Sequence, residues 1–172
     1  MSSDLKTLVK EDLIVQKLTK INKSILSKIN VDEIINELKR MLISRKYRSV
    51  DHTILENATH DVADWTGEIV SHRARLADIK FMVTDHKFKL DDMVKAVQQH
   101  ITTEFSSKLK GQTVNAQKSA VASIIHRPMS TLGKLNRILA LIEIVEKELE
   151  NSYYSSVLIK NIVQLSQQRD TA

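Results

Sequence analysis

The sequence of 172 residues contains no cysteine, one proline, three glycines and only 4% aromatic residues. The absence of cysteine excludes disulfides and cysteine-bound metals as the basis of the fold. Glycine, proline and aromatic residues are also too scarce for a typical sheet protein, because such proteins need turn residues and aromatic or β-branched strands. We therefore expect an all-α fold built from long helices.

Long hydrophobic runs are missing as well. No apolar run approaches the ~20 residues that span a bilayer, and the N-terminus lacks the apolar core of a signal peptide. We expect a cytoplasmic protein, in the host cell cytoplasm if it is viral, without a membrane partner.

Charge is unevenly distributed along the chain. The net charge is +5, yet residues 1–50 carry 11 bases and 6 acids, and residues 104–140 carry 6 bases and 1 acid. The other segments, 51–103 and 141–172, have more acids than bases. The pattern predicts helices that partly neutralise one another and two basic zones that face an anionic partner.

The stretch from Leu55 to His100 has apolar residues at alternating steps of three and four over six heptads. Such spacing predicts one helix, roughly 70 Å long, whose apolar seam meets other helices. A similar seam follows Ser130, after a short helix that we expect to end at Pro128. We expect these seams to join copies of the chain into a homo-oligomer. The residues assigned to oligomerisation are Leu55, Val62, Trp65, Ile69, His72, Leu76, Ile79, Val83, Leu90, Ile142 and Leu149.

The charge distribution and the seams together predict two segments of the chain. Residues 1–50 form a basic N-terminal segment of two helices, and residues 51–172 form an oligomerising and DNA-binding helical core. Within the core, His72, His86 and His100 recur every 14 residues. They lie ~21 Å apart along a helix, so they cannot share a metal within one chain. Polar seam positions that set register are the simpler interpretation.

The sequence shows no motif typical of a catalytic site. The sequence has no glycine-rich phosphate loop and no nucleophile–base constellation, so we expect a protein that is not an enzyme and needs no metal or cofactor. Basic residues flank the central seam instead, and Arg suits phosphate because its planar fork donates two hydrogen bonds. The alternative is that Arg73 and Arg75 pair with acids of their own or a neighbouring helix. The residues assigned to DNA binding are Arg73, Arg75, Lys80, Lys87, Arg45, Lys46, Arg48 and Tyr47.

The pentapeptide His72-Arg73-Ala74-Arg75-Leu76 resembles the Leu-Lys-Ala-Arg-Leu motif of UvsY-type recombination mediators of tailed phages. The resemblance covers roughly residues 55–170. It implies a ring of six or seven subunits that binds single-stranded DNA through Arg73 and Arg75. Such a ring helps to load a recombinase onto strands covered by single-strand binding protein, in recombination, repair and replication. The first 50 residues have no counterpart, and His72 replaces an apolar residue.

Two other interpretations remain open. One is a small terminase-like packaging subunit that forms a ring and prefers duplex DNA, although residues 1–50 lack the glycine-bearing turn of a helix-turn-helix. The other is a helical scaffold that binds only protein, its basic zones being solvated faces. Competition between single- and double-stranded DNA separates the first from a mediator, and absence of DNA binding at low salt indicates the second.

Overall fold

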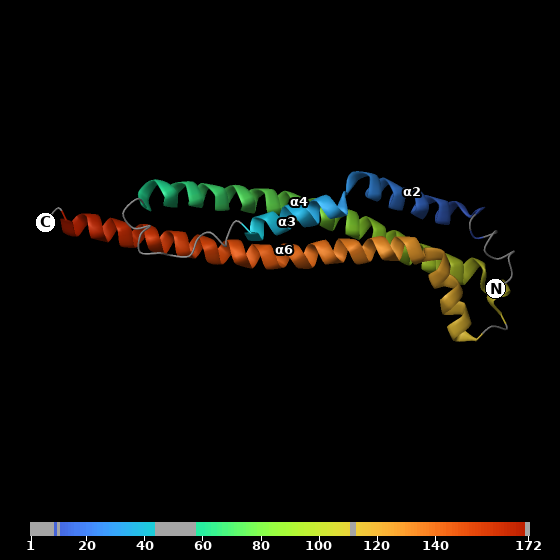
Figure 1. Cartoon of the computed structure of the whole chain (residues 1–172). Coiled ribbons are helices and arrows are strands. Elements are labelled where there is room, and N and C mark those ends of the chain that lie inside the picture. Colours follow the sequence, from blue (N-terminus) through green and yellow to red (C-terminus); the bar gives the residue numbers. More distant parts are fainter. Residues whose placement is uncertain (1–8, 10, 44–57, 111–112, 171–172) are drawn as a thin grey trace. The chain divides into compact units, whose positions relative to one another are not determined.

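The computed structural model describes residues 9, 11–43, 58–110 and 113–170, and in these ranges it contains helices and no strand. The helices are α2 (Leu13–Lys28), α3 (Val31–Ile43), α4 (Ala58–Glu104), α5 (Ser106–Leu109) and α6 (Val114–Asp170) (Figure 1). The all-α prediction is confirmed. In the same ranges, no helix is both long enough and apolar enough to cross a membrane.

Two compact units make up the chain, and each combines segments that are distant in sequence. Unit 1 contains residues 1–31 and 82–138, and unit 2 contains residues 32–81 and 139–172. The N-terminal helices α2 and α3 belong to different units, and the expected division into residues 1–50 and 51–172 stays a prediction. Helices α4 and α6 each contribute one part to unit 1 and the other part to unit 2.

Helix α2 begins at Asp12, whose extended backbone and side chain form an N-cap. The Asp12 carboxylate accepts hydrogen bonds from the backbone N–H groups of Ile14 at 2.8 Å and Val15 at 3.2 Å. These two groups lack partners within the helix, so the cap stabilises its first turn. The core of unit 1 draws on α2, the later part of α4 and the earlier part of α6. Its largest fully buried side chains are Val9, Leu18, Ile29, Leu90, Ile101, Leu135 and Ile138.

The core of unit 2 is formed by α3, the earlier part of α4 and the later part of α6. Helix α3 has acidic residues Asp32 and Glu33 in its first turn, where they favour the positive end of the helix dipole. Its apolar face is buried with those of the other two helices. The deepest side chains include Leu38, Ile69, Leu76, Ile79 and Ile142.

Pro128 does not end a helix, contrary to the expectation from the sequence. Helix α6 continues through it from Val114 to Asp170, and the helix changes direction in its yellow-to-orange part (Figure 1). Proline removes one backbone hydrogen bond and its ring crowds the preceding turn, which kinks a helix. The Pro128 side chain is buried, so packing offsets part of the cost of the interruption.

The seam of α4 lies inside the single chain. The residues at every seventh position from Val62 to Val97 have exposed fractions of 0–5%. These side chains therefore already contact other parts of their own chain. Contact between copies would therefore need another surface, and the oligomer itself stays a prediction. Leu55 lies outside the described residues, while Trp65 and His72 are half-buried. The buried members of the predicted oligomerisation set are Val62, Ile69, Leu76, Ile79, Val83, Leu90, Ile142 and Leu149.

Candidate nucleic-acid interface

The bases predicted to contact DNA differ in how they are held. Arg75, on α4, donates from Nε to Glu37 Oε1 at 2.7 Å and from a terminal nitrogen to Glu37 Oε2 at 3.2 Å. This two-point hydrogen bond from α3 lowers the pKa of the Glu37 carboxyl and raises the pKa of Arg75. A phosphate at Arg75 would have to displace a carboxylate of complementary shape.

Lys80 is held in the same way by α6. Its Nζ donates to both carboxylate oxygens of Glu146 at 2.8 Å, so its charge is neutralised within unit 2. Lys87 is half-buried. The remaining predicted bases and aromatic residue, Arg45, Lys46, Arg48 and Tyr47, lie outside the described residues.

Arg73 remains the best placed of the predicted α4 bases. It is exposed, and its guanidinium carbon lies 5.6 Å from the ring centroid of Tyr153 on α6. A cation over an aromatic face is attracted by the ring quadrupole, while the N–H groups at the guanidinium edge can still donate to a phosphate. The pair Arg73 and Arg75 therefore does not act as one basic unit.

A second basic surface lies on α6 in unit 1. Its members recur at steps of four, three, four and three residues, so they share one face of the helix. All of them are exposed. We call this surface the α6 basic face, and it consists of Ser123, Arg127, Ser130, Lys134 and Arg137.

No carboxylate competes for this face from its own helix, because the sequence has no acidic residue between Glu104 and Glu143. Within the described ranges, Arg127, Lys134 and Arg137 form no ion pair. The opposite side of the same segment is buried, as Leu132, Leu135 and Ile138 show. Core packing therefore points three cations and two hydroxyl-bearing side chains toward solvent.

The sequence contained a signal for this surface. Residues 104–140 carry 6 bases and 1 acid, which marks a basic zone. The pentapeptide around Arg73 and Arg75 instead predicts DNA contacts on α4. The spacing of Arg127, Lys134 and Arg137 becomes informative once α6 is known to continue through Pro128. A break at Pro128 would have left the orientation of Arg127 relative to Lys134 and Arg137 undetermined.

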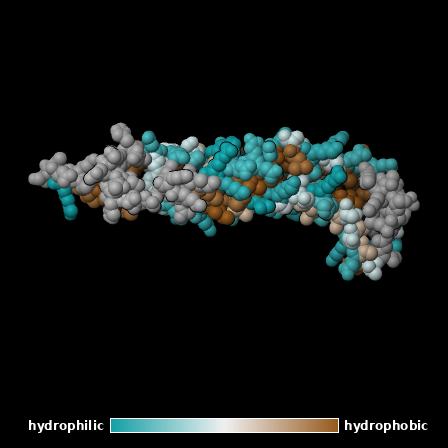
Figure 2. Space-filling model, viewed as in Figure 1, coloured by the Kyte–Doolittle hydropathy of each residue, from teal (hydrophilic) through white to brown (hydrophobic). Residues whose placement is uncertain are grey.

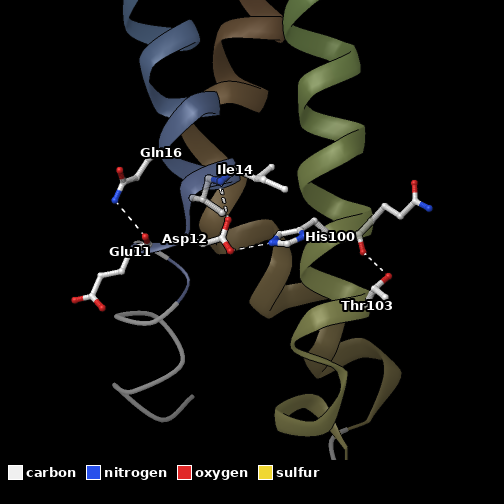
Figure 3. A network of polar contacts seen from close by, with 8 residues as sticks. Glu11, Asp12, Ile14, Gln16, His100 and Thr103 are labelled. Carbon is white, nitrogen blue, oxygen red and sulfur yellow. Dashed lines mark hydrogen bonds and ion pairs between the residues drawn. The ribbon is translucent and has the colours of Figure 1, made fainter.

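The three seam histidines have separate partners instead of a common site. His100 Nε2 lies 2.8 Å from Asp12 Oδ2, so the N-cap of α2 also contacts α4 (Figure 3). His72 lies 3.4 Å from Glu68, and His86 lies 3.9 Å from its neighbour Asp85. Among the described residues, no three potential metal ligands gather in one place.

Hydrogen bonds, burial and nearby charges shift the pKa values of Asp12 and His86. The hydrogen bond with His100 lowers the pKa of Asp12, and the two backbone N–H groups of the cap act in the same direction. Burial lowers the pKa of His86, the Asp85 carboxylate opposes this shift, and the positive charges of Lys89 and Lys28 add to it. The net effect is a pKa below the ordinary value for histidine.

Searches with protein-family models, against curated protein sequences and against solved structures found no match to this chain. Functional inference therefore depends on the residues and their geometry.

Proposed function

We propose that the protein binds single-stranded DNA without sequence specificity, through the α6 basic face with a contribution from Arg73. The observation that supports this most is an exposed helix face with three cations and no carboxylate between Glu104 and Glu143. Such a face contacts phosphates and makes no use of base identity. The proposal requires no catalytic group, metal or cofactor.

The exposed hydroxyl of Ser130 lies between Arg127 and Lys134 on this face. Hydroxyls supplement Arg and Lys as donors to phosphate oxygens. Arg127 and Lys134 are seven residues apart, about two helical turns, and Arg137 lies about one turn further. The spacing provides several contacts along one strand.

The finer role that we propose follows from the resemblance of the central pentapeptide. A mediator would bind the strand as a homo-oligomeric ring and help a recombinase to replace the single-strand binding protein. In that role the partners are single-stranded DNA, the recombinase, the single-strand binding protein and further copies of the chain. Preference for single over double strands is supported by the resemblance, while the basic face itself supports binding to any nucleic acid.

Charge reversal of Arg127, Lys134 and Arg137 together should weaken binding to a fluorescent oligonucleotide by at least tenfold. Each lost phosphate contact should also reduce the salt slope by ~0.7, so three should reduce it by about 2. Anisotropy titrations at several salt concentrations measure both quantities. Circular dichroism shows whether the helices persist.

The matched control reverses the exposed lysines Lys17, Lys20 and Lys23 of α2, which changes the net charge by the same amount. If the control loses as much affinity as the α6 variant, net charge explains binding and the assigned face is wrong. Unchanged affinity and salt slope in the α6 variant would also contradict the proposal. Competition with duplex DNA then separates the mediator role from a packaging role.

A further inference from the structure

A groove in unit 2 provides a second surface, separate from the α6 basic face. It lies between α4 and α6 and has a volume of about 550 Å³. Apolar side chains from both helices line it, among them Val62, Val70 and Val157. Val70 is 54% exposed and Val157 is 37% exposed, so apolar surface is open to solvent here.

The hydroxyls that line the groove add little polarity. Thr66 donates to the carbonyl of Val62 at 2.7 Å, and Ser156 donates to the carbonyl of Tyr153 at 2.7 Å. Both therefore satisfy their hydrogen bonds within their own helices. Gln164 and Tyr153 contribute the other uncharged polar groups of the lining. The rest of the groove is apolar, and a ligand contacts it mainly by hydrophobic burial.

The charge at the groove has one sign. Lys160 is the only charged residue among the described residues that line it, and it is exposed. Tyr153 also lines the groove, and the Arg73 guanidinium lies over its ring. An occupant with a carboxylate beside its apolar side chains would be complementary to both cations.

The groove is elongated along both helices. Its lining runs from Val62 to Val70 on α4 and from Tyr153 to Gln164 on α6, which is about two to three helical turns on each side. An amphipathic helix, with apolar residues at steps of three and four, suits a groove of this length.

We propose that this groove binds an acidic amphipathic helix of a partner protein. A second copy of the chain fits less well. The exposed apolar residues near its C-terminus, such as Ile162 and Leu165, share a helix face with the exposed Arg169. Docking that helix would bring positive charge to a positive groove.

Gly67 allows a test that blocks the groove without disturbing the core. It lines the groove, and a Cβ added there would meet no atom within 4 Å. Gly67→Leu therefore places a side chain in the groove. Gly133 on α6 in unit 1 is a matched control, because an added Cβ there also meets nothing within 4 Å. Lys147→Glu, on an exposed lysine outside the groove, is the control for Lys160→Glu.

The probe is a library of random 16-residue peptides displayed on phage and selected on the full chain. We expect enrichment of apolar residues at steps of three and four, flanked by Asp and Glu. In anisotropy titrations, Gly67→Leu and Lys160→Glu should each weaken a selected peptide by roughly tenfold or more. Gly133→Leu and Lys147→Glu should change its affinity less than about twofold.

Three outcomes would overturn the inference. The first is selection of peptides without acidic enrichment, and the second is equal peptide affinity in wild type and Gly67→Leu. The third is failure to select any peptide. If, in that case, the wild type self-associates and the Gly67→Leu variant is monomeric, the occupant of the groove is a second copy of the chain. DNA affinity should be unchanged in Gly67→Leu, which separates this surface from the α6 basic face.

Discussion

Arg75 illustrates how one contact changes the role expected of a residue. Its sequence context next to Arg73 predicts a phosphate contact, whereas Glu37 holds it from α3 at 2.7 Å. The arginine side chain is 55% exposed, so the pair contributes little to stability, typically below about 1 kcal/mol. Its main effect is electrostatic, because it removes one positive charge from the surface that α4 offers.

His86 is the residue from which a pH dependence follows. Its folded pKa lies below the ordinary 6.5 because of burial, so the unfolded chain binds the proton more readily. The stability that neutral His86 contributes is therefore fully present above about pH 6.5 and is lost as the pH decreases below that value. Asp12, whose folded pKa lies below 3.8, loses its stabilising contribution only in stronger acid.

We expect His86→Leu to reduce the loss of unfolding free energy between pH 8 and pH 5.5. Leucine carries no charge, so protonation no longer favours the unfolded chain at this position. Urea titrations at several pH values measure the change. His126→Leu, on an exposed histidine of α6, should retain the wild-type dependence. A His86→Leu profile parallel to the wild type would contradict the prediction.

At the scale of the element, α4 shows how a heptad pattern behaves in a helix. One row of the seam recurs every seven positions, from Val62 to Val97, and stays buried in both units. In the second row Ile79 is buried in unit 2, whereas Met93 and His100 in unit 1 are half-buried and the residues after them, Val94 and Ile101, are buried. A straight helix drifts ~20° per heptad relative to a 3.5-residue repeat, and the second row accordingly moves by one residue in unit 1.

The buried seam predicts unequal effects of truncation along α4. Leu76→Ala should lower the free energy of unfolding by about 2–5 kcal/mol, because it removes a buried side chain and leaves a cavity. Phe81→Ala should change it by less than about 0.5 kcal/mol, because Phe81 is 78% exposed. Urea unfolding of both variants measures the difference.

Protein concentration provides the control for that comparison. If Leu76 stabilises the single chain, the effect of Leu76→Ala should be the same at low and high concentration. An effect that appears only at concentrations where copies associate would place Leu76 between copies. That result would restore the interface predicted from the heptads.

Helix α6 supports the two proposals with different surfaces. Its earlier part provides the α6 basic face in unit 1, and its later part provides Tyr153, Val157 and Lys160 in unit 2. Figure 2 shows hydrophobic patches in brown among hydrophilic surface in teal. One continuous helix thus contributes both a polar binding face and apolar surface.

For the whole molecule, subunit number is the central prediction. The resemblance implies six or seven copies of a 19.6 kDa chain, so native mass spectrometry should give a particle of six or seven times that mass. Addition of an oligonucleotide should increase the mass by whole oligonucleotides. A monomer at micromolar concentration, with or without DNA, would contradict the ring. The buried seam means that assembly should use surfaces other than Leu76 or Ile142.

Amino-acid composition and periodicity were sufficient to predict helices and most of the buried set. The helices and their buried faces can be predicted from short-range spacing, because apolar residues three and four apart must share one helix face. Composition and periodicity predicted the long helix α4 and the burial of Ile79 and Leu90. They did not predict the passage of α6 through Pro128, since burial of that residue depends on helices distant in sequence.

The charges that remain available to a ligand were decided only by the tertiary structure. Arg75 pairs with a residue 38 positions away, and Lys80 pairs with one 66 positions away. Local patterns carry no information about such distances, so Arg73, Arg75 and Lys80 look equivalent in sequence. Packing neutralises two of them, leaves Arg73 on an aromatic ring and turns Arg127, Lys134 and Arg137 toward solvent. The sequence by itself determined where bases occur, and the fold determined which of them a phosphate can reach.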